Sequence, residues 1–131
     1  MAVTSITIHR DEIDVLVVED DEGVRTTTAE VLRRSGYQVA AVADGLAAEA
    51  LLRALPVRAM VLDVALPRLD GLHLLDDLDD PPLVLLMTAR DYDDDVLARR
   101  DKVVTYLRKP VNPGTLVEEV AHALVSEVPA G

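Results

Sequence analysis

Short apolar runs rich in β-branched residues recur along the chain, separated by segments with helical spacing. The runs cover residues 13–18, 37–42, 59–62, 83–87 and 103–107. Strands that are apolar on both faces are typical of parallel sheets buried between two layers of helices. The runs therefore predict five strands of a parallel sheet.

The segments between these runs repeat apolar residues every three or four positions. The first stripe ends at Gly36, where a helix C-terminus favours a residue with positive φ, and the second is stopped by Pro56. A short third stripe precedes Pro81, residues 93–100 carry the weakest helical signal, and Asn112 can cap a fifth helix. This alternation predicts a three-layer α/β domain, doubly wound, with right-handed crossovers.

Composition narrows the classes of protein to which the chain can belong. The 131 residues suffice for one domain, expected over residues 12–127 between tails at 1–11 and 128–131. The absence of cysteine excludes disulfides and zinc thiolates, and no segment has the character of a signal peptide or a membrane span. We therefore expect a cytoplasmic domain without membrane contact. Its net charge of −11 argues against direct binding of nucleic acid, which needs a basic face.

Polar residues stand at the carboxyl ends of the predicted strands, which is where sheets of this kind bind ligands. The first strand runs into Glu19 and Asp20, the third ends at Asp63, the fourth at Thr88 and the fifth at Lys109. Carboxylates that meet at one edge repel one another unless a cation lies between them. Oxygen ligands with room left for water and a phosphate are typical of a magnesium site.

Charge balance in such a site favours phosphate chemistry. An aspartate can act as a nucleophile toward phosphorus, and a phosphoryl group carrying about −1.5 to −2 charges would need both the cation and Lys109 as partners. Each residue alone has a plainer interpretation: the acidic pair as a helix cap, Asp63 as an ordinary strand-end acid, Thr88 as a strand residue, and Lys109 as a solvated charge. The phosphate hypothesis depends on all of them meeting at one edge of the sheet.

Four segments of the chain resemble the receiver domains of two-component response regulators. They are VLVVEDD at 15–21, VLDVALPRLDG at 61–71, LLMTAR at 85–90 and YLRKP at 106–110. A proline four residues after Asp63 and an Asp-Gly pair seven residues after it are typical of the family, and the resemblance extends over about residues 13–125. It implies a (βα)5 flavodoxin-like sheet with the strand order 2-1-3-4-5.

The resemblance implies a role for each acidic residue. Asp63 would be the phosphoacceptor, and Glu19 and Asp20 would help it bind Mg²⁺. The backbone carbonyl of Ala65 would be a further metal ligand. The phosphoryl group would come from a sensor histidine kinase or a phosphotransfer protein, in a magnesium-dependent phosphorelay.

The resemblance also implies a switch. Thr88 would hydrogen-bond the phosphoryl group, Lys109 would pair with it, and the ring of Tyr106 would turn inward as Thr88 moves toward the phosphate. The bond between Lys109 and Pro110 resembles one that is usually cis in the family. The face made by the fourth helix, the fifth strand and the fifth helix commonly carries output, and a homodimer through this face is one expected assembly.

The chain departs from the family pattern at one place before this face in the sequence and at one place within it. Asp63 and Thr88 are only 25 positions apart, so the third helix or the loop after it is short. The sequence RRDK at 99–102 stands where a Gly-Ala-Asp turn is usual. Both departures leave the phosphorylation site intact.

Other function classes make different demands on the same residues. A haloacid dehalogenase-type phosphatase usually needs a second acid two residues after the nucleophile, where this chain has Ala65. A degenerate receiver that only binds proteins would not need competent residues at all five core site positions. We therefore expect a phosphoacceptor that is not an enzyme, apart from possible self-dephosphorylation. It could be a stand-alone relay or the receiver part of a DNA-binding transcriptional regulator.

Overall fold

The computed structural model describes residues 12–89 and 93–126, so the predicted tails at 1–11 and 128–131 lie outside the described residues. Within this part, strands and helices alternate along the chain as the apolar pattern predicts. No helix in it combines the length and apolar character needed to cross a bilayer. The elements are β1 (Ile13–Val18), α1 (Glu22–Arg34), β2 (Val39–Val42), α2 (Gly45–Ala54), β3 (Val57–Asp63), α3 (Gly71–Asp77), β4 (Leu83–Thr88), α4 (Asp94–Leu97), the 3₁₀ turn η2 (Arg100–Lys102), β5 (Thr105–Arg108) and α5 (Pro113–Ser126).

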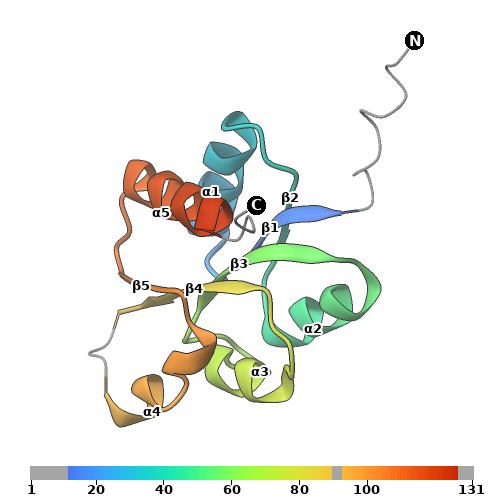
Figure 1. The fold of residues 1–131 in the computed structure, drawn as a ribbon, viewed down its shortest axis with the longest axis vertical. Coiled ribbons are helices and arrows are strands. Elements are labelled where there is room, and N and C mark those ends of the chain that lie inside the picture. The colour runs from blue at the N-terminus through green and yellow to red at the C-terminus, as the bar shows by residue number, and fades with distance from the viewer. Residues whose placement is uncertain (1–11, 90–92, 127–131) are drawn as a thin grey trace.

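The five strands form one parallel sheet in the order β2-β1-β3-β4-β5. Strand order reverses between β1 and β3, because the chain first adds β2 on one side of β1 and then crosses to the other side. Helices α1 and α5 cover one face of the sheet, and α2, α3 and α4 cover the other (Figure 1). The predicted fold class and strand order are confirmed.

Alternate residues of the central strands supply two apolar layers. In β1, Val15 and Val17 pack with α1 and α5, whereas Leu16 and Val18 pack with α2, α3 and α4. All four side chains are fully buried, as expected for a strand covered on both faces. The helices contribute leucine, valine and alanine to both layers, so the absence of Phe and Trp leaves a core of aliphatic residues.

Two strands begin later than the apolar pattern predicts. The second strand was expected from residue 37, but the backbone N–H of Tyr37 still donates to Leu32 in the last turn of α1 (3.3 Å), and β2 starts at Val39. The fifth was expected from residue 103, but the N–H of Val103 donates to Arg100 and closes η2 (3.2 Å). In both cases a preceding helical turn holds an apolar residue that could otherwise extend a strand.

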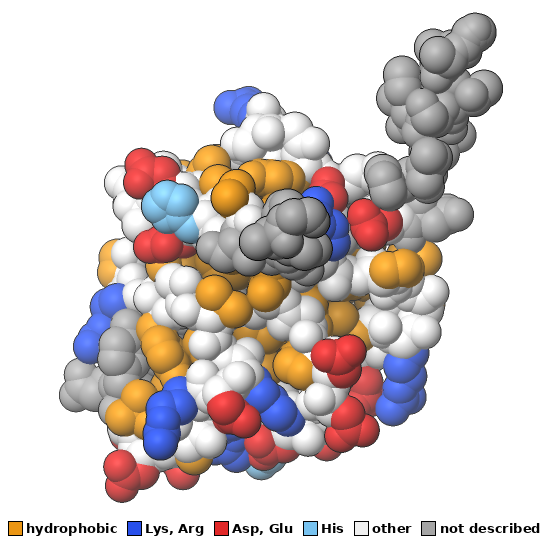
Figure 2. Space-filling model, viewed as in Figure 1, with side chains coloured by type: hydrophobic (Ala, Val, Ile, Leu, Met, Phe, Trp, Pro, Cys, Tyr) orange, Lys and Arg blue, Asp and Glu red, His pale blue; other side chains and the backbone are white. Residues whose placement is uncertain are grey.

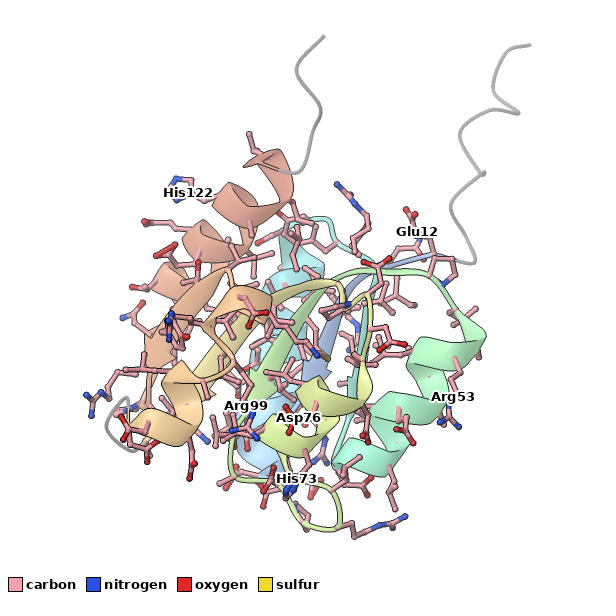
Figure 3. All side chains as sticks on the ribbon, turned by 60° about the horizontal axis from the view of Figure 1, so that its bottom comes forward. Glu12, Arg53, His73, Asp76, Arg99 and His122 are labelled. Atoms are coloured by element: carbon pink, nitrogen blue, oxygen red, sulfur yellow. The ribbon has the colours of Figure 1, made fainter. Side chains whose placement is uncertain are left out.

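The fourth helix is shorter than predicted. A helix was expected over residues 93–100, but α4 covers only Asp94–Leu97, capped by Asp93, and the chain then forms η2. Arg99 makes a two-pronged ion pair with Asp76 of α3, with distances of 3.0 and 2.8 Å (Figure 3). The hydrogen bonds from Arg99 lower the pKa of Asp76 below its ordinary value.

Lys102 adds a second tie between this segment and α3. Its ammonium donates to the backbone carbonyls of Leu75 (2.7 Å) and Leu78 (2.8 Å), at the C-terminal end of α3. Helix C-termini leave carbonyls without intrahelical partners, and cations are favourable there. The residues that replace the usual Gly-Ala-Asp turn therefore anchor the short α4–η2 segment to α3.

Candidate functional site

Strand register brings the predicted site residues to one edge of the sheet. Val18 of β1 pairs with Leu62 of β3, so Glu19 and Asp63 follow side by side. Asp63 pairs with Met87 of β4, which places Thr88 next along that edge. Lys109 follows β5, and its backbone N–H donates to the carbonyl of Thr88 (2.9 Å). Side chains from four strand ends thus meet at the carboxyl edge.

Three carboxylates lie together at this edge. Glu19 is fully buried, Asp63 is 3% exposed, and Asp20 is exposed to solvent. One oxygen from each lies within 4.8 Å of the others. Hard divalent cations such as Mg²⁺ prefer an all-oxygen donor set of this kind, with few protein ligands and open positions for water. The residues present therefore fit a magnesium ion.

Lys109 bridges the two buried carboxylates. Its ammonium is 2.8 Å from Oε1 of Glu19 and 2.9 Å from Oδ2 of Asp63. Burial lowers the pKa of Lys109, but the hydrogen bonds to Glu19 and Asp63 outweigh that effect and raise the pKa above its ordinary value. The lysine therefore stays charged. Three carboxylates and one ammonium leave a net charge of −2, which a divalent cation would neutralise.

Backbone donors hold the other oxygens of the two buried acids. Oε2 of Glu19 accepts from the N–H of Asp21 (3.3 Å), and Oδ1 of Asp63 accepts from the N–H of Ala65 (3.1 Å). Both buried carboxylates are thus oriented by one lysine bond and one backbone bond.

The edge is hollowed into a pocket of about 560 Å³. It is lined by Asp20, Asp63, Ala65, Thr88 and Lys109, among others. Thr88 is 1% exposed and Ala65 is exposed, so the pocket runs from a buried hydroxyl to solvent. The pocket leaves room for a phosphoryl group beside Asp63. The predicted role of the Ala65 carbonyl as a metal ligand stays a prediction.

The predicted switch residues, Thr88 and Tyr106, lie on the neighbouring strands β4 and β5. Tyr106 pairs with Leu86 of β4, is half-buried, and packs against the apolar layer under α2, α3 and α4. The peptide bond between Lys109 and Pro110 is cis. Thr88 ends β4 and Tyr106 lies two register positions back on β5, and a role for them in switching stays a prediction.

Sequence reasoning did not give a role to Gly71. A Cβ atom at this position would lie 2.4 Å from the carbonyl oxygen of Asp63, closer than Cβ atoms approach backbone, and a tight 3.1 Å from Cα of Val64. The N–H of Gly71 also donates to the carbonyl of Val64 (3.0 Å). The first turn of α3 thus packs directly on the backbone of Asp63, and the Asp-Gly pair was the signal for it.

Sequence reasoning also missed Arg25, on the first turn of α1. One guanidinium nitrogen, Nη1, donates to the backbone carbonyls of Glu19 (3.1 Å) and Asp20 (3.2 Å). A cation near a helix N-terminus is unfavourable for the helix dipole. That local mismatch was the available signal.

A family model described as the response regulator receiver domain matches residues 15–121, which lie inside the predicted domain of residues 12–127. The chain is 35% identical over 117 residues to the transcriptional regulatory protein CseB of Streptomyces coelicolor. It is 39% identical over 103 residues to the response regulator MprA of Mycobacterium tuberculosis. The alignments cover 87% and 75% of this chain but 50% and 44% of those relatives, so the chain spans about half the length of the curated relatives that it matches.

Solved receiver domains share the fold. The CheY-like receiver domain protein from Methanospirillum hungatei superposes with a TM-score of 0.81 at 24% identity, covering 88% of this chain and 95% of that one. The receiver domain of the Francisella response regulator 1452 gives 0.81 at 23% identity, covering 89% and 100%. At this level of identity the two structures bear on the fold alone.

Proposed function

Because the chain belongs to the family of response regulator receiver domains, we propose that it accepts a phosphoryl group on Asp63 in a magnesium-dependent phosphorelay. A sensor histidine kinase or a phosphotransfer protein would supply the group. The observation that carries the proposal is the meeting of three carboxylates and one lysine, from three strand ends, in an open pocket.

At Asp63 a phosphoryl group would pass from one nucleophile, a nitrogen of the donor, to another, a carboxylate oxygen. A carboxylate oxygen of Asp63 forms a bond to phosphorus as the bond between phosphorus and the donor nitrogen breaks. Magnesium bound by Glu19, Asp20, Asp63 and the Ala65 carbonyl would neutralise charge on the phosphoryl oxygens. Such reactions depend mainly on positioning and electrostatics, which the backbone bonds to the acids support.

Lys109 and Thr88 are the proposed partners of the bound phosphoryl group. Lys109 is already held charged beside Asp63, so its ammonium can exchange a carboxylate oxygen for a phosphoryl oxygen. The buried hydroxyl of Thr88 lines the same pocket and can donate to another oxygen. Both residues would then favour the phosphorylated form.

Switching is proposed as a shift between two existing conformations. Thr88 ends β4, and Tyr106 lies on the adjacent strand, two register positions back. Movement of Thr88 toward the phosphoryl group would open space into which the Tyr106 ring turns. The consequence would appear on the face made by α4, β5 and α5, where Leu97 of α4 is 36% exposed and Val104, just before β5, is 50% exposed. Apolar side chains exposed there would suit a homodimer or another protein partner.

A phosphodonor protein must approach Asp63 from the carboxyl edge. A second pocket of about 620 Å³ lies beside the acidic one and shares Lys109 with it. It is mostly apolar, with Val24 and Thr28 of α1 on one side and Val111 and Leu116 on the other. We propose that the donor protein packs here. Direct binding of nucleic acid is not proposed, because the net charge is −11 and basic side chains are mixed with acidic ones around α2, α3 and α4 (Figure 2).

The direct test is labelling by acetyl phosphate in the presence of Mg²⁺, followed by intact-mass spectrometry. The wild type should gain one phosphoryl group, and Asp63→Asn should gain none. Asp77→Asn removes an exposed carboxylate of α3 and serves as the control, so it should label normally. Undiminished labelling of Asp63→Asn would defeat the site assignment. Steady turnover of a phosphomonoester such as p-nitrophenyl phosphate would instead favour a haloacid dehalogenase-type phosphatase.

A second candidate function follows from the relatives. CseB is named a transcriptional regulatory protein, and this chain covers half of it. We propose that the domain could serve as the receiver part of a DNA-binding regulator. An antibody raised against the domain should then detect, in the source cells, a protein of about twice its 14.2 kDa. A single band at the mass of the domain would favour a stand-alone relay.

A further inference from the structure

Arg25 clamps the backbone of the loop that carries two of the proposed magnesium ligands. Its Nη1 donates to the carbonyls of Glu19 and Asp20, at 3.1 and 3.2 Å. Those carbonyls belong to the peptide groups on the C-terminal side of each acid. Since a peptide group is planar, fixing both carbonyls restrains the backbone dihedral angles of Asp20, which lies between the two groups.

Asp20 is the acid that most needs this restraint. Glu19 and Asp63 are buried and each is held by Lys109 and by a backbone N–H. Asp20 is exposed, and within residues 12–89 and 93–126 no hydrogen bond reaches its carboxylate. The direction of its side chain therefore depends on its backbone. The carbonyl bonds from Arg25 are a specific hold on that backbone.

The place of Arg25 on the helix is consistent with such a role. It lies at the end of the first turn of α1, after Glu22, where an acid suits the helix dipole and a cation does not. A guanidinium is planar and carries several donors in a fixed arrangement, so one group can serve two acceptors. Arg25 is thus unfavourable for the helix dipole, but it makes two hydrogen bonds to the backbone of residues 19–20.

We propose that Arg25 is a positioning residue for the cation site, which sets the direction of Asp20 through the backbone of residues 19–20. The proposal rests on the proposed function, because it assumes that these acids bind Mg²⁺. Partners that orient metal ligands from outside the first shell typically change metal affinity by about 10- to 100-fold when removed. We expect a loss of Mg²⁺ affinity in that range for Arg25→Ala.

The opposite sign is expected if Arg25 acts only through its charge. A cation near the acids repels Mg²⁺, so its removal alone would tighten binding. Arg25→Lys separates the two effects, because it keeps the charge but has no planar group to hold two carbonyls. Positioning predicts weak binding by Arg25→Ala and intermediate binding by Arg25→Lys. Charge alone predicts tighter binding by Arg25→Ala and unchanged binding by Arg25→Lys.

The chain offers a matched control on the same helix. Arg33 donates to a single backbone carbonyl, that of Val39 (3.0 Å), at the other end of α1. Arg33→Ala therefore removes an arginine and a bond of the same type far along the helix from the acids. Its affinity for Mg²⁺ should equal that of the wild type.

The experiment is titration of each purified variant with MgCl₂ by isothermal calorimetry, with melting followed by circular dichroism in EDTA. Arg25→Ala should bind about 10- to 100-fold more weakly than Arg33→Ala even where the two melt alike. If Arg25→Ala does not fold, the Arg25→Lys titration decides. Equal or tighter binding by the Arg25 variants would overturn the positioning role alone. Failure of the wild type to bind Mg²⁺ would instead overturn the proposed function.

Discussion

Replacing Lys109 by methionine should destabilise the domain strongly without magnesium and much less with it. The substitution keeps most of the aliphatic stem and removes the ammonium that lies 2.8 Å from Glu19 and 2.9 Å from Asp63. Those carboxylates are 0% and 4% exposed, so the variant leaves two buried negative charges without their shared partner. Asp20 adds a third nearby charge.

The expected size follows from that geometry. Removing one partner of a fully buried ion pair costs about 3–5 kcal/mol, but the Lys109 side chain is 23% exposed, and screening by water brings our expectation to about 2–3 kcal/mol in EDTA. Bound Mg²⁺ would supply the missing positive charge. The variant should therefore bind Mg²⁺ more tightly than the wild type does, and tighter binding to the native state stabilises it more. At saturating Mg²⁺ the loss of stability should fall to about half of its value in EDTA or less.

Urea unfolding followed by far-ultraviolet circular dichroism measures both quantities, and suits a chain without tryptophan. Lys102→Met is the control. Lys102 also makes two short bonds, at 2.7 and 2.8 Å, but to the neutral carbonyls of Leu75 and Leu78. Its loss of stability should be the same with and without Mg²⁺. If Lys109→Met showed that same indifference to the ion, the electrostatic account of the site would be refuted.

Gly71→Ala should lower the free energy of unfolding by about 1–3 kcal/mol and slow labelling by acetyl phosphate, because its Cβ would lie 2.4 Å from the carbonyl oxygen of Asp63. Gly23→Ala, the control, should have neither effect. Normal labelling of a fully stable Gly71→Ala would contradict this prediction. Burial lowers the pKa of Lys109, but bonds to the acids raise it overall, so the stability due to its charge is fully present below the ordinary lysine pKa of about 10.4 and is lost as pH rises through the higher folded value. The difference between wild type and Lys109→Met in EDTA should therefore hold steady from about pH 7 to 9 and shrink above about 10.4; a difference that shrank by pH 8 would be inconsistent with it. Beryllofluoride with Mg²⁺ should raise the dimer fraction measured by light scattering. Val104→Asp should prevent this rise, whereas Leu46→Asp, at an exposed residue of α2, should not. Equal dimerisation by the Val104 variant would exclude the proposed face.

Local pattern was sufficient for the alternation of elements and for the residues at the strand ends. Glu19, Asp63 and Lys109 could be placed at one edge because parallel strands carry their carboxyl ends to the same side of a sheet. Local pattern was insufficient where a helix competed with a strand for apolar residues. Tyr37 and Val103 were expected in strands, but the backbone N–H of each donates to the helical turn before it. Either a helical or a strand partner suits such an N–H, and the local sequence does not show which one is favoured.

The sequence by itself determined the kind of domain and the chemistry available at its edge, because periodicity and residue type are local properties. Only the tertiary structure decided which distances and contacts turn those residues into a site: the lysine bridge across 90 positions of chain, the contact of Gly71 with the backbone of Asp63, and the hold of Arg25 on the carbonyls beside Asp20. These contacts arise from packing between elements. Packing depends on the position of every covering helix, which no single segment encodes.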